Sequence, residues 1–177
     1  ELSQDGEALQ VFDDVEAAAL LAVAWAAGGE PPLPKHLDAA HRASPVWTAD
    51  TVRVASWRAR GDVSAGCLVV VRQPLKTPDP AAQRDWAATV LRALESDTPP
   101  EGLLSANFFA SRDGKVVLNF AEWTSAEAHR EALRRGSYGQ HGSIGSSEPW
   151  RATREHPAIT PEHEVRRYIP HRALAPS

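Results

Sequence analysis

The stretch from Ser105 to Tyr138, SANFFASRDGKVVLNFAEWTSAEAHREALRRGSY, decides the fold that the sequence predicts. Ser-Arg-Asp-Gly at 111–114 indicates a hairpin turn, because Gly accepts a positive φ and Asp tolerates one. Strands are expected before and after this turn, over 103–110 and 115–123. A helix should follow to about Arg135, with Thr124 and Glu127 as its capping box. The unit is therefore strand, turn, strand and helix.

The second of these strands is largely apolar on both faces, so it should be covered on both sides. Asn119 is the exception. An amide on a covered face needs hydrogen-bond partners or a ligand to be tolerated. Trp123 stands four residues later on the same strand, so its side chain points the same way as that of Asn119.

The chain on either side of this unit supplies the rest of one domain. Residues 67–72 form a continuous apolar run that favours a central strand. Asp79 followed by Pro80 begins a helix that runs to about Glu95. Residues 164–174 are expected to form the last strand. The order β-α-β-β-α-β over 65–174 predicts an α+β, ferredoxin-like domain with an antiparallel sheet.

Residues 1–60 are interpreted as a partial or diverged second ferredoxin-like unit, arranged strand, helix, strand. We expect a strand over 7–12, a helix over 14–27, a short helix over 35–43 and a strand over 51–58. Residues 5–28 match 113–136 at a constant offset, which favours a diverged internal repeat; chance similarity of Ala-rich helices is the alternative. Valines replace Asn119 and Trp123 in the first copy, so one site per chain is expected.

Composition excludes several function classes. The net charge of −4 and the lack of Lys/Arg clusters give no case for nucleic acid. The single Cys67 predicts neither disulfides nor a thiol metal site and suits a cytoplasmic protein. No apolar stretch is long enough for a membrane span. Histidine spacing predicts no metal site, and no phosphate-binding loop is present. The chain contains no Met, so we expect that Glu1 is not the native start.

The run from Phe108 to Ser125, FFASRDGKVVLNFAEWTS, resembles the antibiotic biosynthesis monooxygenase family, and its anthrone-oxygenase-like members in particular. Members have ferredoxin-like domains that pair into dimeric α+β barrels. The better-known ones oxidise anthrones and related polycyclic phenols to quinones with O2 and no cofactor. The resemblance implies a homodimer, an aromatic polyketide substrate, O2 as co-substrate and no cofactor.

The resemblance also implies that Asn119 and Trp123 are the catalytic pair. Asn119 would hydrogen-bond a phenol or enol oxygen and favour its deprotonated form. Trp123 would shape an aromatic slot and contact the same oxygen, or O2, through its indole N–H.

Four further residues are predicted to bind substrate: His129, Tyr138, Phe109 and Trp86. His129 stands near the position of a Tyr in better-characterised members and is either a general base or a partly exposed helix histidine. Phe109, where anthrone-oxidising relatives can carry His, gives only an apolar wall. Tyr138 lies in a lid candidate over 136–148 and could replace the lost hydroxyl.

Two alternatives stay open at this point. Haem-degrading monooxygenases share the fold and use an Asn, a Trp and a haem-ligating His, although His129 and His141 match the axial-ligand spacing poorly. A non-catalytic binding or structural member of the same fold is the second alternative.

Overall fold

The protein is described from a computed structural model, and the structure describes residues 8–14, 20–25, 51–59, 63–96, 98–137, 144 and 147–170. Its elements, in chain order, are β1 (Ala8–Asp14), β2 (Leu20–Trp25), β3 (Thr51–Arg58), β4 (Cys67–Pro74), α2 (Pro80–Ser96), β5 (Leu103–Ser111), β6 (Val116–Trp123), α3 (Ala126–Ser137), α4 (Glu148–Arg154) and β7 (Glu164–Pro170).

All the described strands join one seven-stranded sheet in the order β2-β1-β7-β4-β6-β5-β3. Every pair of neighbours in it is antiparallel. Its middle four strands, with α2 and α3, follow the chain order β4-α2-β5-β6-α3-β7. This is the βαββαβ arrangement, so the predicted α+β ferredoxin-like fold is confirmed. β3 extends the sheet beside β5, and the β1–β2 hairpin extends it beside β7.

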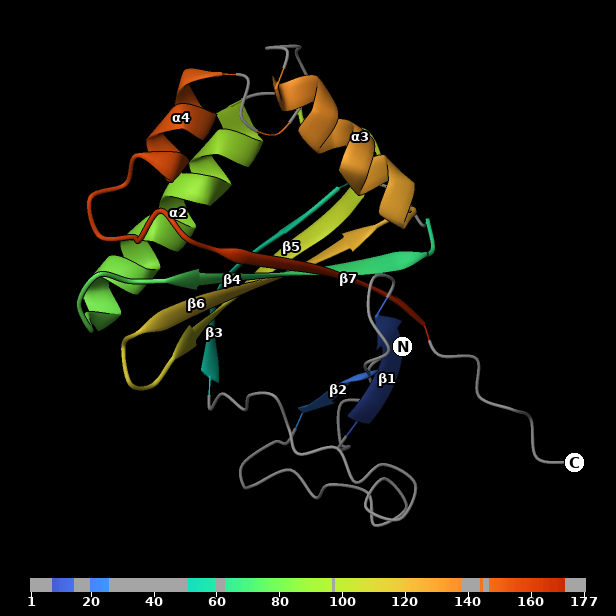
Figure 1. Ribbon diagram of the computed structural model, residues 1–177, viewed down its shortest axis with the longest axis horizontal. Coiled ribbons are helices and arrows are strands. Elements are labelled where there is room, and N and C mark those ends of the chain that lie inside the picture. Colours follow the sequence, from blue (N-terminus) through green and yellow to red (C-terminus); the bar gives the residue numbers. More distant parts are fainter. Residues whose placement is uncertain are drawn as a thin grey trace, which may run out of the picture.

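The helices α2, α3 and α4 lie on one face of the sheet, with α4 beside α2 and α3 apart from them (Figure 1). Because α2 repeats apolar residues at i, i+4 spacing, Trp86, Val90 and Leu94 are all buried on the side that meets the sheet. They contribute to a core with Phe108 of β5 and Trp123 of β6. The core therefore lies between the helices and the middle strands.

The predicted start of α2 is confirmed. Asp79 Oδ1 accepts hydrogen bonds from the backbone N–H groups of Ala81, at 2.8 Å, and Ala82, at 3.1 Å. The predicted hairpin turn is present as well, and Gly114 has a φ of +76°, which is accessible to Gly at little cost.

The capping residue of α3 was predicted wrongly. Ser125, and not Thr124, accepts the backbone N–H of Ala128 through its Oγ, at 3.0 Å. The helix begins at Ala126. The cap therefore stands one residue later, because Thr124 still belongs to the end of the sheet: its N–H donates to the carbonyl of Gly102.

The helix expected over 14–27 was also wrong, because residues 20–25 form β2. The run LLAVAW is apolar throughout, and such a short run fits a buried strand as well as a buried helix. Pairing with β1, from Ala8 opposite Trp25 to Asp13 opposite Leu20, satisfies its backbone. The first copy of the proposed repeat therefore has a strand over 20–25, where the second copy has helix α3. The helix expected over 35–43 lies outside the described residues, and the division at residue 60 stays a prediction.

The segment over 136–148 was predicted as a lid. Most of it lies outside the described residues, but α4 begins at Glu148 and was not anticipated. Within the described part of the chain, no helix is long and apolar enough to cross a membrane.

Gln83 of α2 fastens the helix to the β5–β6 hairpin. Its side chain is 1% exposed. Its Nε2 donates to the carbonyl oxygens of Ser111, at 3.1 Å, and Val116, at 2.7 Å, and lies 3.2 Å from the Ser111 hydroxyl. One buried amide thus pairs with both ends of the turn.

We predict that Gln83→Leu lowers the free energy of unfolding by about 1–3 kcal/mol, because it leaves buried acceptors without their donor. Urea denaturation followed by circular dichroism measures the change. Glu95→Gln, at an exposed position of the same helix, is the control and should leave the midpoint unchanged. A Gln83→Leu midpoint equal to that of the wild type would contradict the prediction.

Candidate active site

Asn119 lies in the middle of β6, which pairs with β4 on one side and with β5 on the other. Its Cα is opposite Val71 of β4 and Phe108 of β5. It shares the helix-covered face with Val117 and Trp123, as the alternation predicted. Its Oδ1 is buried and has no hydrogen-bond partner. A buried carbonyl oxygen of this kind is unusual in folded proteins and marks a place where a ligand could donate a hydrogen bond.

Trp123 closes the same strand and is 1% exposed. Its indole Nε1 is buried and also lacks a partner. The end of the strand is held tightly: the N–H of Gly66 donates to the Trp123 carbonyl at 2.9 Å. A Cβ at Gly66 would lie only 2.3 Å from the Thr124 carbonyl oxygen, so only Gly fits there.

The indole N–H of Trp86, unlike that of Trp123, has a hydrogen-bond partner. Its Nε1 donates to the Thr153 carbonyl of α4 at 3.1 Å, so its polar atom joins α2 to α4. Its ring meets Phe108 edge-on, with centroids 6.2 Å apart. Because Phe108 is the register neighbour of Asn119, Trp86 lies on the same side of the sheet as Asn119, one aromatic ring away.

His129 of α3 points at the sheet. This orientation agrees with the interpretation of His129 as a residue of the site. His129 is 4% exposed, so the alternative of a partly exposed helix histidine was wrong. Ala132, one turn later, is buried beside it, whereas Leu133 is 36% exposed and faces outward. The imidazole meets the Trp123 indole edge-on, with centroids 4.9 Å apart. Helix α3 therefore brings His129 and Trp123 together.

The charge state of His129 follows from its surroundings. Burial, and then the nearby guanidinium groups of Arg167 and Arg130, lower the pKa of His129 to about 4. The imidazole is thus neutral at pH 7. Its Nδ1 accepts a hydrogen bond from Arg167 Nε of β7, at 3.0 Å. A neutral ring that accepts at Nδ1 carries its proton on Nε2.

The structure does not bring Phe109 to this group. Its ring meets Phe120 edge-on, with centroids 5.3 Å apart, and Phe120 alternates with Asn119 along β6. Phe109 therefore lies on the face of the sheet away from the helices, and Phe108 occupies the position beside Asn119. Tyr138 lies outside the described residues.

Three residues around the site were not predicted from the sequence: Phe108, Arg167 and Val71. Phe108 could have been predicted from the sequence, because strand alternation and the hairpin register place it opposite Asn119. Arg167 could not have been predicted, because its contact with His129 joins residues that lie far apart in the sequence. Val71 completes the surroundings as the second register neighbour of Asn119.

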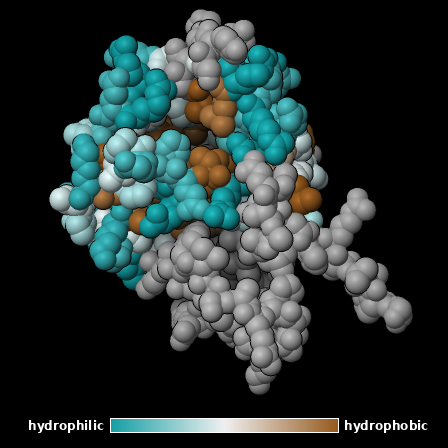
Figure 2. All heavy atoms as spheres, in the orientation of Figure 1, coloured by the Kyte–Doolittle hydropathy of each residue, from teal (hydrophilic) through white to brown (hydrophobic). Residues whose placement is uncertain are grey.

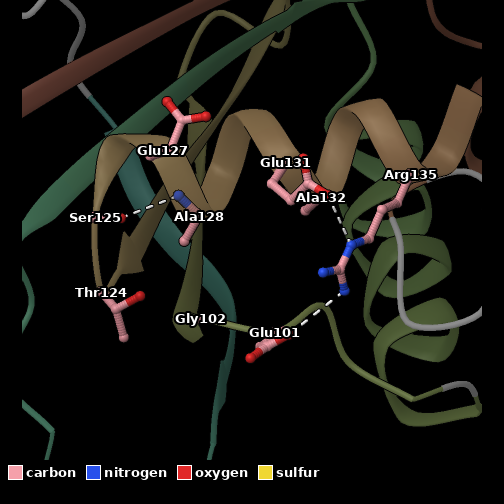
Figure 3. Close-up of a pocket in the computed structure, with 9 residues that line it drawn as sticks. All are labelled: Glu101, Gly102, Thr124, Ser125, Glu127, Ala128, Glu131, Ala132 and Arg135. Atoms are coloured by element: carbon pink, nitrogen blue, oxygen red, sulfur yellow. Dashed lines mark hydrogen bonds and ion pairs between the residues drawn. The ribbon is translucent and has the colours of Figure 1, made fainter.

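The surface is hollowed between the hydrophilic surfaces of α4 and α3, and hydrophobic residues gather in the hollow (Figure 2). A separate groove of about 340 Å³ runs between α3 and the turn before β5 (Figure 3). Arg135 crosses this groove to Glu101, at 3.5 Å, and also pairs with Glu131, at 3.0 Å. None of the predicted site residues lines it. The unpaired atoms of Asn119 and Trp123 therefore identify the candidate site better than this groove does.

In the described part of the chain, no three His, Cys, Asp or Glu side chains are grouped as a metal site would require.

Comparisons with known proteins bear on the fold. No protein-family model and no curated protein matches the sequence. A crystal structure of an anthrone oxidase-like protein matches with a TM-score of 0.58 and 15% identity, over 92% of this chain and 76% of that chain. The structure of a major regulator of staphylococcal pathogenesis matches with a TM-score of 0.54 and 10% identity, over 94% of this chain and 86% of that chain.

A third match is a monooxygenase from the gene ActVA-Orf6 of Streptomyces coelicolor in complex with nanaomycin D. It has a TM-score of 0.46 and 27% identity, over 64% of this chain and 94% of that chain. The match to the anthrone oxidase-like protein shows a shared fold. The chain therefore has the fold implied by the family that its Phe108–Ser125 motif resembles.

The lowered pKa of His129 predicts an acid-sensitive fold. The unfolded chain takes up a proton at this residue near pH 6.5, whereas the folded chain does so only near pH 4. Stability contributed by the neutral ring is therefore present above pH 6.5 and is lost as the pH falls. The loss is about 2 kcal/mol by pH 5 and about 3 kcal/mol in total.

His129→Asn keeps an acceptor for Arg167 and does not titrate, so its free energy of unfolding should fall less between pH 7 and pH 5. Urea denaturation at several pH values measures both curves. Parallel curves for the variant and the wild type would show that His129 is not held neutral.

Proposed function

We propose that this chain is a cofactor-independent monooxygenase that oxidises a polycyclic phenol or anthrone to a quinone with O2. One observation carries the proposal: two buried polar atoms of opposite kind, the acceptor Asn119 Oδ1 and the donor Trp123 Nε1, lack partners on the same face of β6. Each such atom costs about 1–3 kcal/mol when it stays unpaired. A ligand that pairs with both would recover that free energy.

The two atoms define the ligand chemically. Asn119 Oδ1 requires a hydrogen-bond donor, such as a phenol O–H. Trp123 Nε1 requires an acceptor, such as a carbonyl or enolate oxygen. The two Cα atoms are four residues apart on a strand, or about 13 Å. A rigid fused-ring framework with polar oxygens at separate positions suits such a pair, and a hydroxylated anthrone has these features.

The aromatic residues beside Asn119 suit the same ligand. Phe108 is its register neighbour, and Trp86 packs on Phe108. The proposal gives Trp86 and Phe108 the role of an apolar wall and gives His129, beside Trp123, a hydrogen bond to a substrate oxygen. Tyr138 stays a predicted substrate contact. An aromatic polyketide as substrate and a homodimer as assembly belong to the same proposal.

The reaction balances without a bound cofactor. The substrate loses a proton from the carbon to be oxidised and becomes an enolate. The enolate transfers electrons to O2, and the carbon–oxygen bond forms as a hydroperoxide after proton uptake. Loss of water then breaks the O–O bond and leaves a carbonyl. One oxygen atom of O2 is retained in the quinone and the other leaves as water. Hydrogen bonds to the enolate oxygen would stabilise its negative charge.

We expect Asn119→Leu and Trp123→Phe each to lower kcat/KM for quinone formation at least tenfold, since each removes a group that would meet the substrate. The assay incubates purified protein with a panel of anthrones and naphthols under 18O2, with no cofactor added. Mass spectrometry should find one labelled oxygen in the quinone. Wild-type rates in both variants would reject the assignment of the site.

Stability gives a second readout of the same variants. Asn119→Leu removes an unpaired buried oxygen, so it should leave the fold as stable as the wild type or more stable. Asn107→Leu is the matched control on β5. Its amide donates to Ser105 Oγ, at 3.2 Å, and to the Phe120 carbonyl, at 3.4 Å. The control should therefore lose stability and keep activity.

The two alternatives predict different results in the same assay. A haem-degrading enzyme would show a Soret band when haem is added, and verdohaem-like products would follow. A binding member would bind an anthrone without ever yielding a quinone in air.

A further inference from the structure

A hydrogen bond joins β7 to α3 beside Trp123. Arg167 Nε lies 3.0 Å from His129 Nδ1. A guanidinium group can only donate, so the imidazole nitrogen must accept. The direction of this bond is therefore certain, although most histidine hydrogen bonds leave the tautomer undecided.

We propose that Arg167 is a positioning residue that holds His129 as the neutral Nε2–H tautomer, so that His129 offers the substrate a proton donor and not a base. The proposal rests on the proposed function, because it assigns a role within that site. It also sharpens the substrate class: the oxygen that approaches Trp123 and His129 should be an acceptor, such as a carbonyl or enolate oxygen.

The geometry around the ring supports this role. Arg167 lies in the middle of β7, opposite Val69 of β4, so the sheet fixes its backbone. The Trp123 indole packs against the imidazole with ring centroids 4.9 Å apart. Trp123 Nε1–H has no partner in the described structure. Two N–H donors, on Trp123 and on His129, therefore belong to rings in contact, and one substrate oxygen with two lone pairs could accept from both.

The charges around His129 favour the same state. Arg167 on β7 and Arg130 on α3 both disfavour a proton on the imidazole, and burial disfavours it further. Arg130 also pairs with Glu127 at 3.4 Å on the exposed side of the helix. A ring held in this state is a poor proton acceptor at neutral pH. The enolate must therefore form without His129 as its base.

Imidazole 15N NMR of the free protein tests the tautomer directly. We expect the His129 resonances of the wild type to show a protonated Nε2 and a bare Nδ1 from pH 7 down to about pH 5. In Arg167→Met, the ring should populate both neutral tautomers, and its titration should shift to higher pH. A protonated Nδ1 in the wild type, or identical spectra in the variant, would overturn the proposal.

Two further variants keep the test decisive. Arg167→Lys can still donate to Nδ1 and should restore the Nε2–H tautomer, even if Arg167→Met folds poorly. Arg166→Met is the matched control, because Arg166 directly precedes Arg167 on β7 and pairs with Glu164. Its spectra should equal those of the wild type.

Kinetics separates this proposal from the proposed function. With an anthrone that the wild type oxidises, Arg167→Met should lower kcat at least tenfold, and its pH profile should acquire a new limb between pH 5 and pH 7. Wild-type kcat in Arg167→Met would remove the role of Arg167 and leave the oxygenase intact. An Nε2–H tautomer together with no oxidised substrate would support the Arg167–His129 pair and reject the oxygenase.

Discussion

The hydrogen bonding of β6 on both sides is the constraint on which the rest depends. β4 and β5 pair with it along almost its whole length, so each of its side chains is assigned to one face. Val117, Asn119, Ala121 and Trp123 face the helices, and no local adjustment can turn one of them away without breaking two ladders. Gly66 fixes the end of the strand by a backbone contact that a larger residue would disturb. The position of the candidate site is thus a property of the sheet, and the helices α2 and α3 only close over it.

Elsewhere the fold pairs its buried polar groups thoroughly. Gln83 pairs with the hairpin, Gln73 with the carbonyls of Pro74 and Thr160, and Trp86 with Thr153. Against that background, the unpaired atoms are informative. In the described part of the chain they are Asn119 Oδ1, Trp123 Nε1 and Ser147 Oγ. Ser147 precedes the short helix α4, away from β6, but the other two share one face of one strand. A chain that satisfies its amides so well elsewhere keeps this pair at a cost in stability, as functional sites commonly do.

The parts of the fold that follow from local chemistry were predictable from the sequence. The Asp79–Pro80 start of α2, the turn at Gly114 and the alternation of β6 each depend on a few adjacent residues. The short apolar run of β2 was misread because its length and composition fit two kinds of element, and pairing with β1 decided between them. The placement of Phe109 failed for a different reason: it was carried over from relatives, whereas the pleat of β5 assigns Phe108 to the helix face. The Arg167–His129 contact depends on how α3 lies across β7, and no local pattern encodes that.

If His129 donates a hydrogen bond to the substrate and does not take a proton from it, the substrate must offer an acceptor oxygen. With His129 neutral and Trp123 beside it, the site would stabilise negative charge on an oxygen and thereby lower the pKa of the substrate itself. Such a site suits compounds that are already weakly acidic, because stabilisation of the enolate can replace a strong protein base. The site would also discriminate between substrates with and without an acceptor oxygen. A substrate without an acceptor oxygen at that position would leave the buried Trp123 N–H unpaired and the His129 N–H without its substrate partner. That penalty rejects analogues more strongly than a lost apolar contact does. Selectivity and activation of the substrate would then come from the same two donors.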